Sequence, residues 1–181
     1  LAGIHYQFEA IHPFLDGNGR IGRLLMSLLL CSEGALSEPL LYLSAYFEQR
    51  REDYYRLLLG VSQAGRWDEW ISFFLQGVAE QSKDAIGRSE QLLALWHTYR
   101  ATLQSARSSA LQLQLVDELF SYPAITIGQA AKRLKVTQRS AQLNVEKLVR
   151  KNILREGTGK KRNRVFMAPE IIKIIEASRA G

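Results

Sequence analysis

Apolar residues recur at helical spacing in the first part of the chain. Ile4, Phe8 and Ile11 follow the spacing i, i+4, i+7, which places them on one face of a helix that Pro13 should end. Residues 21–31 are apolar nearly all round, the pattern of a helix buried in a core. The opening of the chain therefore predicts two helices joined by a short loop.

Longer helices are expected in the middle of the chain. Residues 46–60 and 67–83 predict two helices with Gly65 between them. Residues 89–114 are rich in Leu, Ala, Ser and Gln and contain no Pro or Gly, so this segment predicts a connecting helix rather than a flexible linker.

The last part of the chain has a different pattern, in which short helices precede two strands. Capping-box spacing at Thr126–Gln129 and a second N-cap candidate, Thr137, indicate closely spaced helix starts. Three short helices followed by a hairpin are the layout of a winged helix. The expected elements are a helix with Leu111, Leu115 and Leu119, helices with Ala130–Leu134 and Ala141–Val149, strands at 153–156 and 164–167, and a closing helix with Ile171, Ile172 and Ile175.

Charge is distributed unevenly along the chain. From Lys132 to Arg164 there are twelve Lys and Arg against two acidic residues, so this stretch carries +10, whereas the rest carries −4. A basic stretch favours polyanionic partners, and a mildly acidic front half does not. A solvated basic surface without a ligand is the alternative interpretation.

Composition excludes several classes of protein. With 46% hydrophobic and 23% charged residues, the chain is not a disordered polypeptide. The single cysteine, Cys31, excludes a disulfide framework and fits a reducing, cytoplasmic location. The longest apolar run, 24–31, is far shorter than the ~20 residues of a bilayer span, so no membrane partner is expected.

The densest group of chemistry-bearing residues lies between the first two predicted helices. The residue types of the turn Gly17-Asn-Gly19 tolerate positive φ, so their backbone N–H groups can converge on an anion at the positive end of the next helix. Arg20 and Arg23 are one helical turn apart and can both face that anion. This turn predicts a phosphate-binding site, although isolated Gly-Asn-Gly turns are common.

Two further side chains complete the candidate site. Asp16 is a hard oxygen ligand placed to bind a Mg²⁺ ion that bridges two phosphates. His12 can accept a proton from an attacking hydroxyl group, so the loop predicts a Mg–nucleotide site with a general base. His5, Glu9 and His12 imitate a metal-binding face, but zincin spacing places two histidines four apart, and these are seven apart.

This loop resembles the signature of the Fic family. The family pattern, His-x-Phe-x-Asp/Glu-Gly-Asn-Gly-Arg-x-x-Arg, is matched at every fixed position by His12, Phe14, Asp16, Gly17, Asn18, Gly19, Arg20 and Arg23. The flanking segments and the winged-helix tail are also similar to the family. The resemblance implies a mainly α fold, with residues 1–88 as the C-terminal part of a Fic catalytic domain, 89–110 as a connecting helix, and 111–181 as a winged helix-turn-helix domain with a small β-hairpin.

The resemblance implies a bacterial protein adenylyltransferase, which transfers AMP from Mg–ATP to a Tyr, Ser or Thr hydroxyl of a target protein. It makes His12 the general base and Asp16 the Mg²⁺ ligand, with Phe14 anchoring the loop in the core. A homodimer is left open. The nucleotide-binding residues that it implies are Gly17, Asn18, Gly19, Arg20, Arg23 and, beside the base, Tyr54 and Tyr55.

Two family features are not found in this sequence. The family's β-hairpin flap, which aligns the target segment, precedes the motif, and only eleven residues precede His12. The inhibitory pattern Ser/Thr-x-x-x-Glu-Gly/Asn is missing, because Leu29 and Asn152 stand where its Ser/Thr would be. Since position 1 is not a methionine, we expect the sequence to start inside a longer enzyme and to be incomplete without the upstream part.

Two alternative functions remain open. One is a DNA-binding regulator in which the front half senses nucleotide or is an inactive scaffold, although winged helices also mediate protein contacts. The other is a Fic relative that transfers phosphate or phosphocholine, against which the intact Gly17–Gly19 turn argues. The expected DNA contacts are Gln138, Arg139 and Gln142 on base edges and Lys160, Lys161, Arg162 and Arg164 on phosphates.

Overall fold

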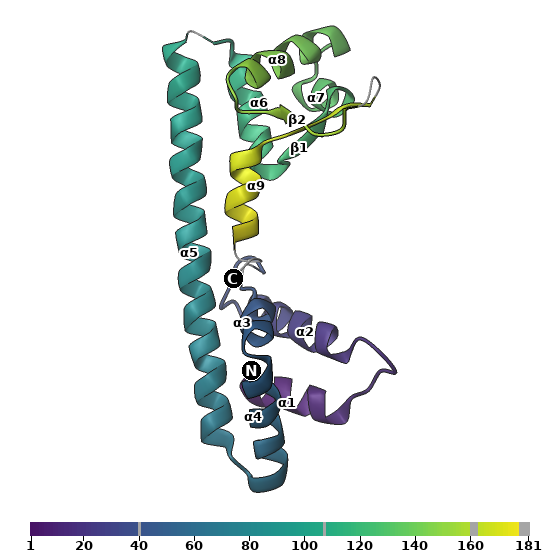
Figure 1. Cartoon of the computed structure of the whole chain (residues 1–181), viewed down its shortest axis with the longest axis vertical. Helices are drawn as coiled ribbons and strands as arrows, with labels where there is room; N and C mark the ends of the chain where they lie inside the picture. The colour runs from purple at the N-terminus through teal and green to yellow at the C-terminus, as the bar shows by residue number, and fades with distance from the viewer. Residues whose placement is uncertain (40, 107, 160–162, 178–181) are drawn as a thin grey trace. The chain divides into compact units, whose positions relative to one another are not determined.

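The computed structural model describes residues 1–39, 41–106, 108–159 and 163–177 (Figure 1). The fold is mainly helical with one small sheet, as the sequence predicts. The chain divides into two compact units between residues 87 and 88, and helix α5 (Trp67–Ser105) contributes to both. In the described residues, no helix combines the length and the apolar character that crossing a membrane requires.

The first unit is built from helices around an aromatic core. It contains α1 (Ala2–Ile11), α2 (Asn18–Ser32), α3 (Leu43–Gln49), α4 (Arg51–Ala64) and the first part of α5. The indole of Trp70 donates to the Ala2 carbonyl at 2.9 Å, which fastens the start of α1 to α5. The largest buried aromatic side chains are Tyr46, Phe47, Tyr54, Trp70, Phe73 and Phe74.

The expectation that the helix at 21–31 is buried all round is wrong. Leu24 and Leu28 on α2 are 57% and 55% exposed, and the buried positions of this helix are Asn18, Gly22 and Met26. The buried positions recur every four residues, so α2 packs on one face against the rest of the unit.

Two predicted helix boundaries also differ from the structure. The helix expected at 46–60 is two helices, because the backbone leaves the helical region at Arg50 (φ −118°, ψ 41°). The helix expected at 67–83 and most of the connecting segment form the single helix α5 of 39 residues, which ends at Ser105.

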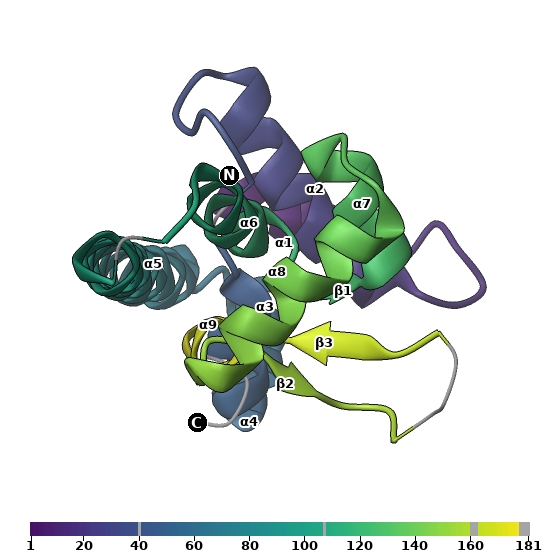
Figure 2. The same cartoon turned by 90° about the horizontal axis from the view of Figure 1, so that it is seen from above.

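The second unit has a winged-helix topology. Its sheet has the order β1-β3-β2, both pairs are antiparallel, and Ile125 lies opposite Phe166. Figure 2 shows β2 and β3 side by side below α8. After the second part of α5 come α6 (Ala110–Ser121), β1 (Ala124–Thr126), α7 (Ile127–Leu134), α8 (Gln138–Arg150), β2 (Arg155–Glu156), β3 (Val165–Met167) and α9 (Pro169–Glu176).

Two predicted helix caps in this unit are confirmed. The Thr126 hydroxyl accepts from the Gln129 backbone N–H at 3.2 Å, and the Gln129 side chain accepts from the Thr126 N–H at 2.8 Å. The Thr137 hydroxyl accepts from the Ser140 N–H at 3.2 Å and begins α8. These side chains satisfy backbone donors that a helix start leaves unpaired.

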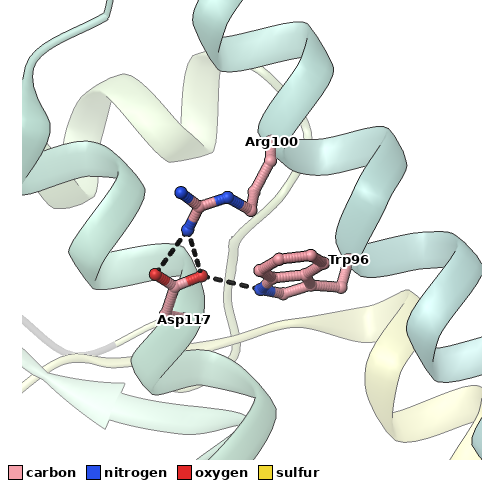
Figure 3. Close-up of polar contacts among 3 residues, drawn as sticks. All are labelled: Trp96, Arg100 and Asp117. Atoms are coloured by element: carbon pink, nitrogen blue, oxygen red, sulfur yellow. Dashed lines mark hydrogen bonds and ion pairs between the residues drawn. The ribbon is translucent and has the colours of Figure 1, made fainter.

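A polar cluster attaches the second part of α5 to α6 (Figure 3). The Arg100 guanidinium donates to both carboxylate oxygens of Asp117, at 2.6 and 2.8 Å, and the Trp96 indole donates to one of them at 2.7 Å. The Arg100 guanidinium also lies 4.8 Å from the centre of the Trp96 ring. Three hydrogen bonds from two side chains therefore hold one carboxylate and attach α6 to α5.

Candidate active site

The candidate site is the loop between α1 and α2. The helix α1 ends at His12, which has a left-handed conformation (φ 49°, ψ 57°) and donates its backbone N–H to the Phe8 carbonyl at 3.1 Å. Gly17 has φ 83° and is the N-cap of α2. Of the three residues of the Gly17–Gly19 turn, Gly17 alone has a positive φ, because Asn18 and Gly19 already belong to α2.

The side chain of Asn18 fastens this loop. It is buried, its amide oxygen accepts from the Phe14 N–H at 2.9 Å, and its amide nitrogen donates to the Phe14 carbonyl at 2.6 Å. The expectation that Phe14 anchors the loop in the core is wrong, since its side chain is 47% exposed and its ring lies 6.3 Å from that of Phe8. A polar bridge, rather than a buried ring, sets the loop's shape.

Charged side chains surround the start of α2. One oxygen of Asp16 accepts from the Gly17 N–H at 2.6 Å, and the other lies 3.6 Å from the Arg20 guanidinium. A Cβ placed on Gly17 would lie 3.4 Å from the Arg20 guanidinium, and one on Gly19 would lie 3.0 Å from that of Arg23. Both guanidinium groups therefore lie against the Gly17–Gly19 turn, where the first N–H groups of a helix have no intrahelical partners.

Two residues beside the loop were not singled out as site residues from the sequence. Ser44, on α3, accepts from the Nε of Arg23 at 3.1 Å, and no local pattern connects positions 21 residues apart. Burial raises the pKa of Glu9, against the charges of Arg23 and His12, which lower it. Glu9 precedes His12 by three residues, and residues three apart on a helix are neighbours. This spacing was the signal in the sequence that could have placed Glu9 beside His12.

Gly22 sets how closely α1 approaches α2. A Cβ at this position would lie 2.6 Å from a carboxylate oxygen of Glu9, 3.0 Å from the Phe8 ring and 3.4 Å from the His5 ring. The Glu9 oxygen is the end of a flexible side chain and can move away, but the Phe8 ring would have to shift by a few tenths of an ångström, so glycine allows the closest approach of the two helices.

His5 and Tyr54 lie in the core behind the loop. The Nε2 atom of His5 is 2.9 Å from the Tyr54 hydroxyl, and the imidazole is fully buried among aromatic rings. Burial lowers the pKa of His5 to about 4 and raises that of Tyr54. With 5% of its surface exposed, Tyr54 cannot flank a bound base as expected, whereas Tyr55 is 57% exposed.

The structure brings all four of the described DNA-contact candidates together. A groove of about 650 Å³ lies between the start of α8, the start of α7 and the hairpin. Arg164 also lies 3.5 Å from a Glu156 carboxylate oxygen, so its charge is partly paired. Lys160, Lys161 and Arg162 lie outside the described residues. The groove is lined by Thr126, Ile127, Gly128, Gln138, Arg139, Gln142, Asn163 and Arg164.

Solved structures with similar coordinates include two bacterial regulators. A MarR family transcriptional regulator from Silicibacter pomeroyi matches with a TM-score of 0.34 and 20% identity, over 65% of this chain and 71% of that chain. The multiple antibiotic-resistance repressor of Listeria monocytogenes matches with a TM-score of 0.32 and 22% identity, over 54% of this chain and 73% of that chain.

Curated relatives of this chain include proteins named protein adenylyltransferase. A probable protein adenylyltransferase from Aquifex aeolicus is 44% identical over 48 residues, which are 26% of this chain and 15% of that protein. The protein adenylyltransferase Fic of Nematostella vectensis is 36% identical over 105 residues, 56% of this chain and 22% of that protein. The chain thus spans less than a quarter of these relatives. The Fic/DOC family model matches residues 1–30, so this N-terminal segment is similar to that family.

Proposed function

We propose that this chain carries the AMP-transferring centre of a protein adenylyltransferase. The observation that supports it is the arrangement of one loop, in which two guanidinium groups lie against the start of α2 and an exposed imidazole, His12, ends α1. Helix N-termini bind phosphates through free N–H groups and the helix dipole. The Fic/DOC family model matches the segment that contains this loop, and relatives of the chain are named protein adenylyltransferase.

The proposed mechanism is an in-line displacement at the α-phosphorus of ATP. The N–H groups at the start of α2, with Arg20 and Arg23, bind the phosphates and stabilise the charge that develops on them. His12 accepts the proton of the target hydroxyl while its oxygen forms a bond to the α-phosphorus. The bond from that phosphorus to the bridging oxygen breaks, and pyrophosphate leaves with the electron pair.

The donor set of the loop fits a Mg²⁺ ion bound together with the nucleotide. Among the described residues, no group of three or more His, Cys, Asp and Glu side chains forms a metal site, but Mg²⁺ commonly binds one or two carboxylates plus substrate phosphates. Asp16 is the exposed carboxylate beside the turn and would hold the ion. When bound, Mg²⁺ would neutralise phosphate charge and orient the leaving group.

Asp16→Ala is expected to uncouple nucleotide binding from Mg²⁺. The wild type should bind ATP more tightly with Mg²⁺ than without it, whereas the variant should bind equally in both conditions and transfer AMP about a hundredfold more slowly, the size of the effect when one preorganised electrostatic group is removed. Calorimetry with and without Mg²⁺ measures the first effect. Asp68→Ala, in the first turn of α5, is the control that should change neither quantity.

Two radioactive labels on ATP test the proposed function directly. Incubation of the full-length protein with a protein extract should transfer label from α-labelled ATP to protein, and no label from γ-labelled ATP. Transfer of the γ label instead would assign phosphate transfer, and transfer of neither label would contradict a nucleotide-dependent transferase.

DNA binding by the second unit is a second candidate function, which the groove at the start of α8 favours. The N-terminal end of a recognition helix contacts base edges in winged-helix and related folds, and Gln138, Arg139 and Gln142 line this groove. The groove also receives Arg164 from the hairpin, so base-reading and phosphate-binding groups converge there.

Neutralising the hairpin cations should weaken duplex binding and flatten its salt dependence. Glutamine at Lys160, Lys161, Arg162 and Arg164 is expected to reduce the slope of log affinity against log salt by about 0.9 for each DNA phosphate that the variant no longer neutralises. Fluorescence anisotropy of a labelled duplex at several salt concentrations measures the slope.

The matched control for this test removes four cations from the first unit. It carries glutamine at Arg51, Arg56, Arg66 and Lys83, all outside the winged helix. If the control and the hairpin variant lose the same affinity, the binding reflects net charge alone and the second function is wrong.

A further inference from the structure

The two arginines at the start of α2 have different partners. The Arg20 side chain is 77% exposed, and its guanidinium lies 3.6 Å from a carboxylate oxygen of Asp16. Arg23 is half-buried, and its Nε donates to the hydroxyl of Ser44 at 3.1 Å. Arg20 thus pairs with the carboxylate that is proposed to hold Mg²⁺, whereas Arg23 is held by a neutral group on another helix, α3.

The bond to Ser44 uses one end of the Arg23 guanidinium and leaves the other end available. A guanidinium has five N–H donors, of which Nε carries one. Among the described residues, the two terminal nitrogens of Arg23 have no hydrogen-bond or ion-pair partner. The nearer of them, Nη1, lies 3.0 Å from the position of a Cβ on Gly19. Four N–H donors therefore remain on the end of Arg23 that lies against the Gly17–Gly19 turn.

A hydroxyl partner also leaves the charge of Arg23 intact. A carboxylate at the position of the Ser44 hydroxyl would neutralise the guanidinium and compete with phosphate for it. A hydrogen bond from a charged donor to a neutral acceptor is still stronger than one between two neutral groups. Ser44 therefore fixes the orientation of Arg23 without reducing its attraction for an anion.

The Ser44 hydroxyl is itself held by packing around α3. Ser44 lies in the first turn of this helix, between the buried side chains of Leu43 and Tyr46. A second hydrogen bond joins the same parts of the fold, because the Ser27 hydroxyl on α2 donates to the Leu41 carbonyl at 3.2 Å. A side chain is positioned accurately when its partner lies on a rigid, packed element.

We infer that Ser44 is a positioning residue, which holds Arg23 in the orientation that binds the phosphates of the nucleotide. This inference rests on the proposed function, in which Arg23 is one of the phosphate-binding groups. An arginine side chain loses much rotational freedom when it binds a ligand. Because Ser44 orders Arg23 in the folded protein before the nucleotide arrives, part of that loss precedes binding, and the affinity for ATP is higher.

Calorimetry of ATP binding to the full-length protein tests this role. Ser44→Ala should weaken binding about three- to tenfold, the cost of ordering one long side chain. Ser44→Thr keeps the hydroxyl and should bind ATP as the wild type does. The matched control is Ser27→Ala, which also removes one serine hydroxyl between α2 and the segment that enters α3 but does not contact Arg23, so it should leave the affinity unchanged.

Two further measurements separate positioning from a general structural effect. In the Arg23→Ala background, Ser44→Ala should cause no additional loss of ATP affinity, because the residue through which it acts is gone. Without nucleotide, the NMR order parameter of the Arg23 Nε–H bond should fall in Ser44→Ala and stay unchanged in Ser27→Ala.

The outcomes distinguish this inference from the proposed function. If the wild type binds ATP and Ser44→Ala binds it equally well, the role of Ser44 is wrong and the proposed function stands. An equal loss in the wild-type and Arg23→Ala backgrounds would also overturn the inference, because Ser44 would then act through another group. If the affinities change as expected but no α label reaches a protein, Ser44 positions Arg23 for nucleotide binding and AMP transfer is refuted.

Discussion

His12→Ala is expected to reduce AMP transfer about 10²- to 10⁴-fold while ATP still binds, which is the usual contribution of a positioned general base. The two effects separate because His12 ends α1, whereas the groups proposed to bind phosphate start α2. His12 is exposed, and its side chain makes no hydrogen bond to the residues that the structure describes, so its removal should leave the Asn18 bridge to Phe14 intact. Transfer of α-labelled ATP and calorimetry of ATP binding measure the two quantities.

The control for this variant is His97→Ala. His97 is an exposed histidine on α5 in the second unit and should be dispensable for transfer. Undiminished transfer by His12→Ala would refute its assignment as the base, and equal loss in both variants would point to an indirect effect.

His5 is expected to make the first unit acid-sensitive. Its pKa is lowered from 6.5 to about 4 by burial, so the folded protein keeps the imidazole neutral where the unfolded chain would protonate it. Between about pH 6.5 and pH 4 the unfolded state binds more protons, and stability therefore falls as the pH falls. At 1.36 kcal/mol per pKa unit, the loss approaches about 3 kcal/mol at the acid end of this range.

A variant without a titratable group at position 5 separates the pH dependence caused by His5 from the pH dependence caused by carboxylates. His5→Gln should be less stable than the wild type at pH 7, because it disturbs the aromatic core and the contact with Tyr54. By about pH 4.5 the difference in unfolding free energy between the wild type and His5→Gln should be about 2–3 kcal/mol smaller than at pH 7. Urea unfolding at the two pH values measures it, with His97→Gln as the control. A difference that stays constant with pH would mean that His5 is not held neutral.

Local signals in the sequence were sufficient to predict the winged helix. The Thr126–Gln129 and Thr137 caps were predicted correctly because capping depends on residues within one turn of each other. The hairpin followed from its two glycines and the apolar residues on either side. The strand β1 was missed, since three residues carry too little pattern and its pairing with β3 is distant in sequence.

Errors in the first unit arose where tertiary contacts override local pattern. No Gly or Pro marks the break at Arg50, so the sequence could not predict two helices there. Tyr54 and Tyr55 are adjacent on a helix, where successive side chains point about 100° apart, so one ring is buried and the other is exposed.

The motif itself identified the loop but assigned the role of Phe14 incorrectly. A motif reports which residues are present, not which contacts hold them. Phe14 was expected to anchor the loop in the core but is half-exposed, and the amide of Asn18 holds the loop instead. The burial of Asn18 depends on the packing of α2 and is not encoded in the residue spacing.

Because Gly22 has no side chain, α1 and α2, which carry the two halves of the candidate centre, can approach each other closely. His12 moves with α1 and the Gly17–Gly19 turn moves with α2, and these helices touch where Gly22 meets Phe8 and Glu9. Gly22 therefore influences the distance between His12, the proposed base, and the turn proposed to bind phosphate. A larger side chain at position 22 is therefore expected to change the rate of the proposed AMP transfer, although His12 and the residues of the turn are all still present.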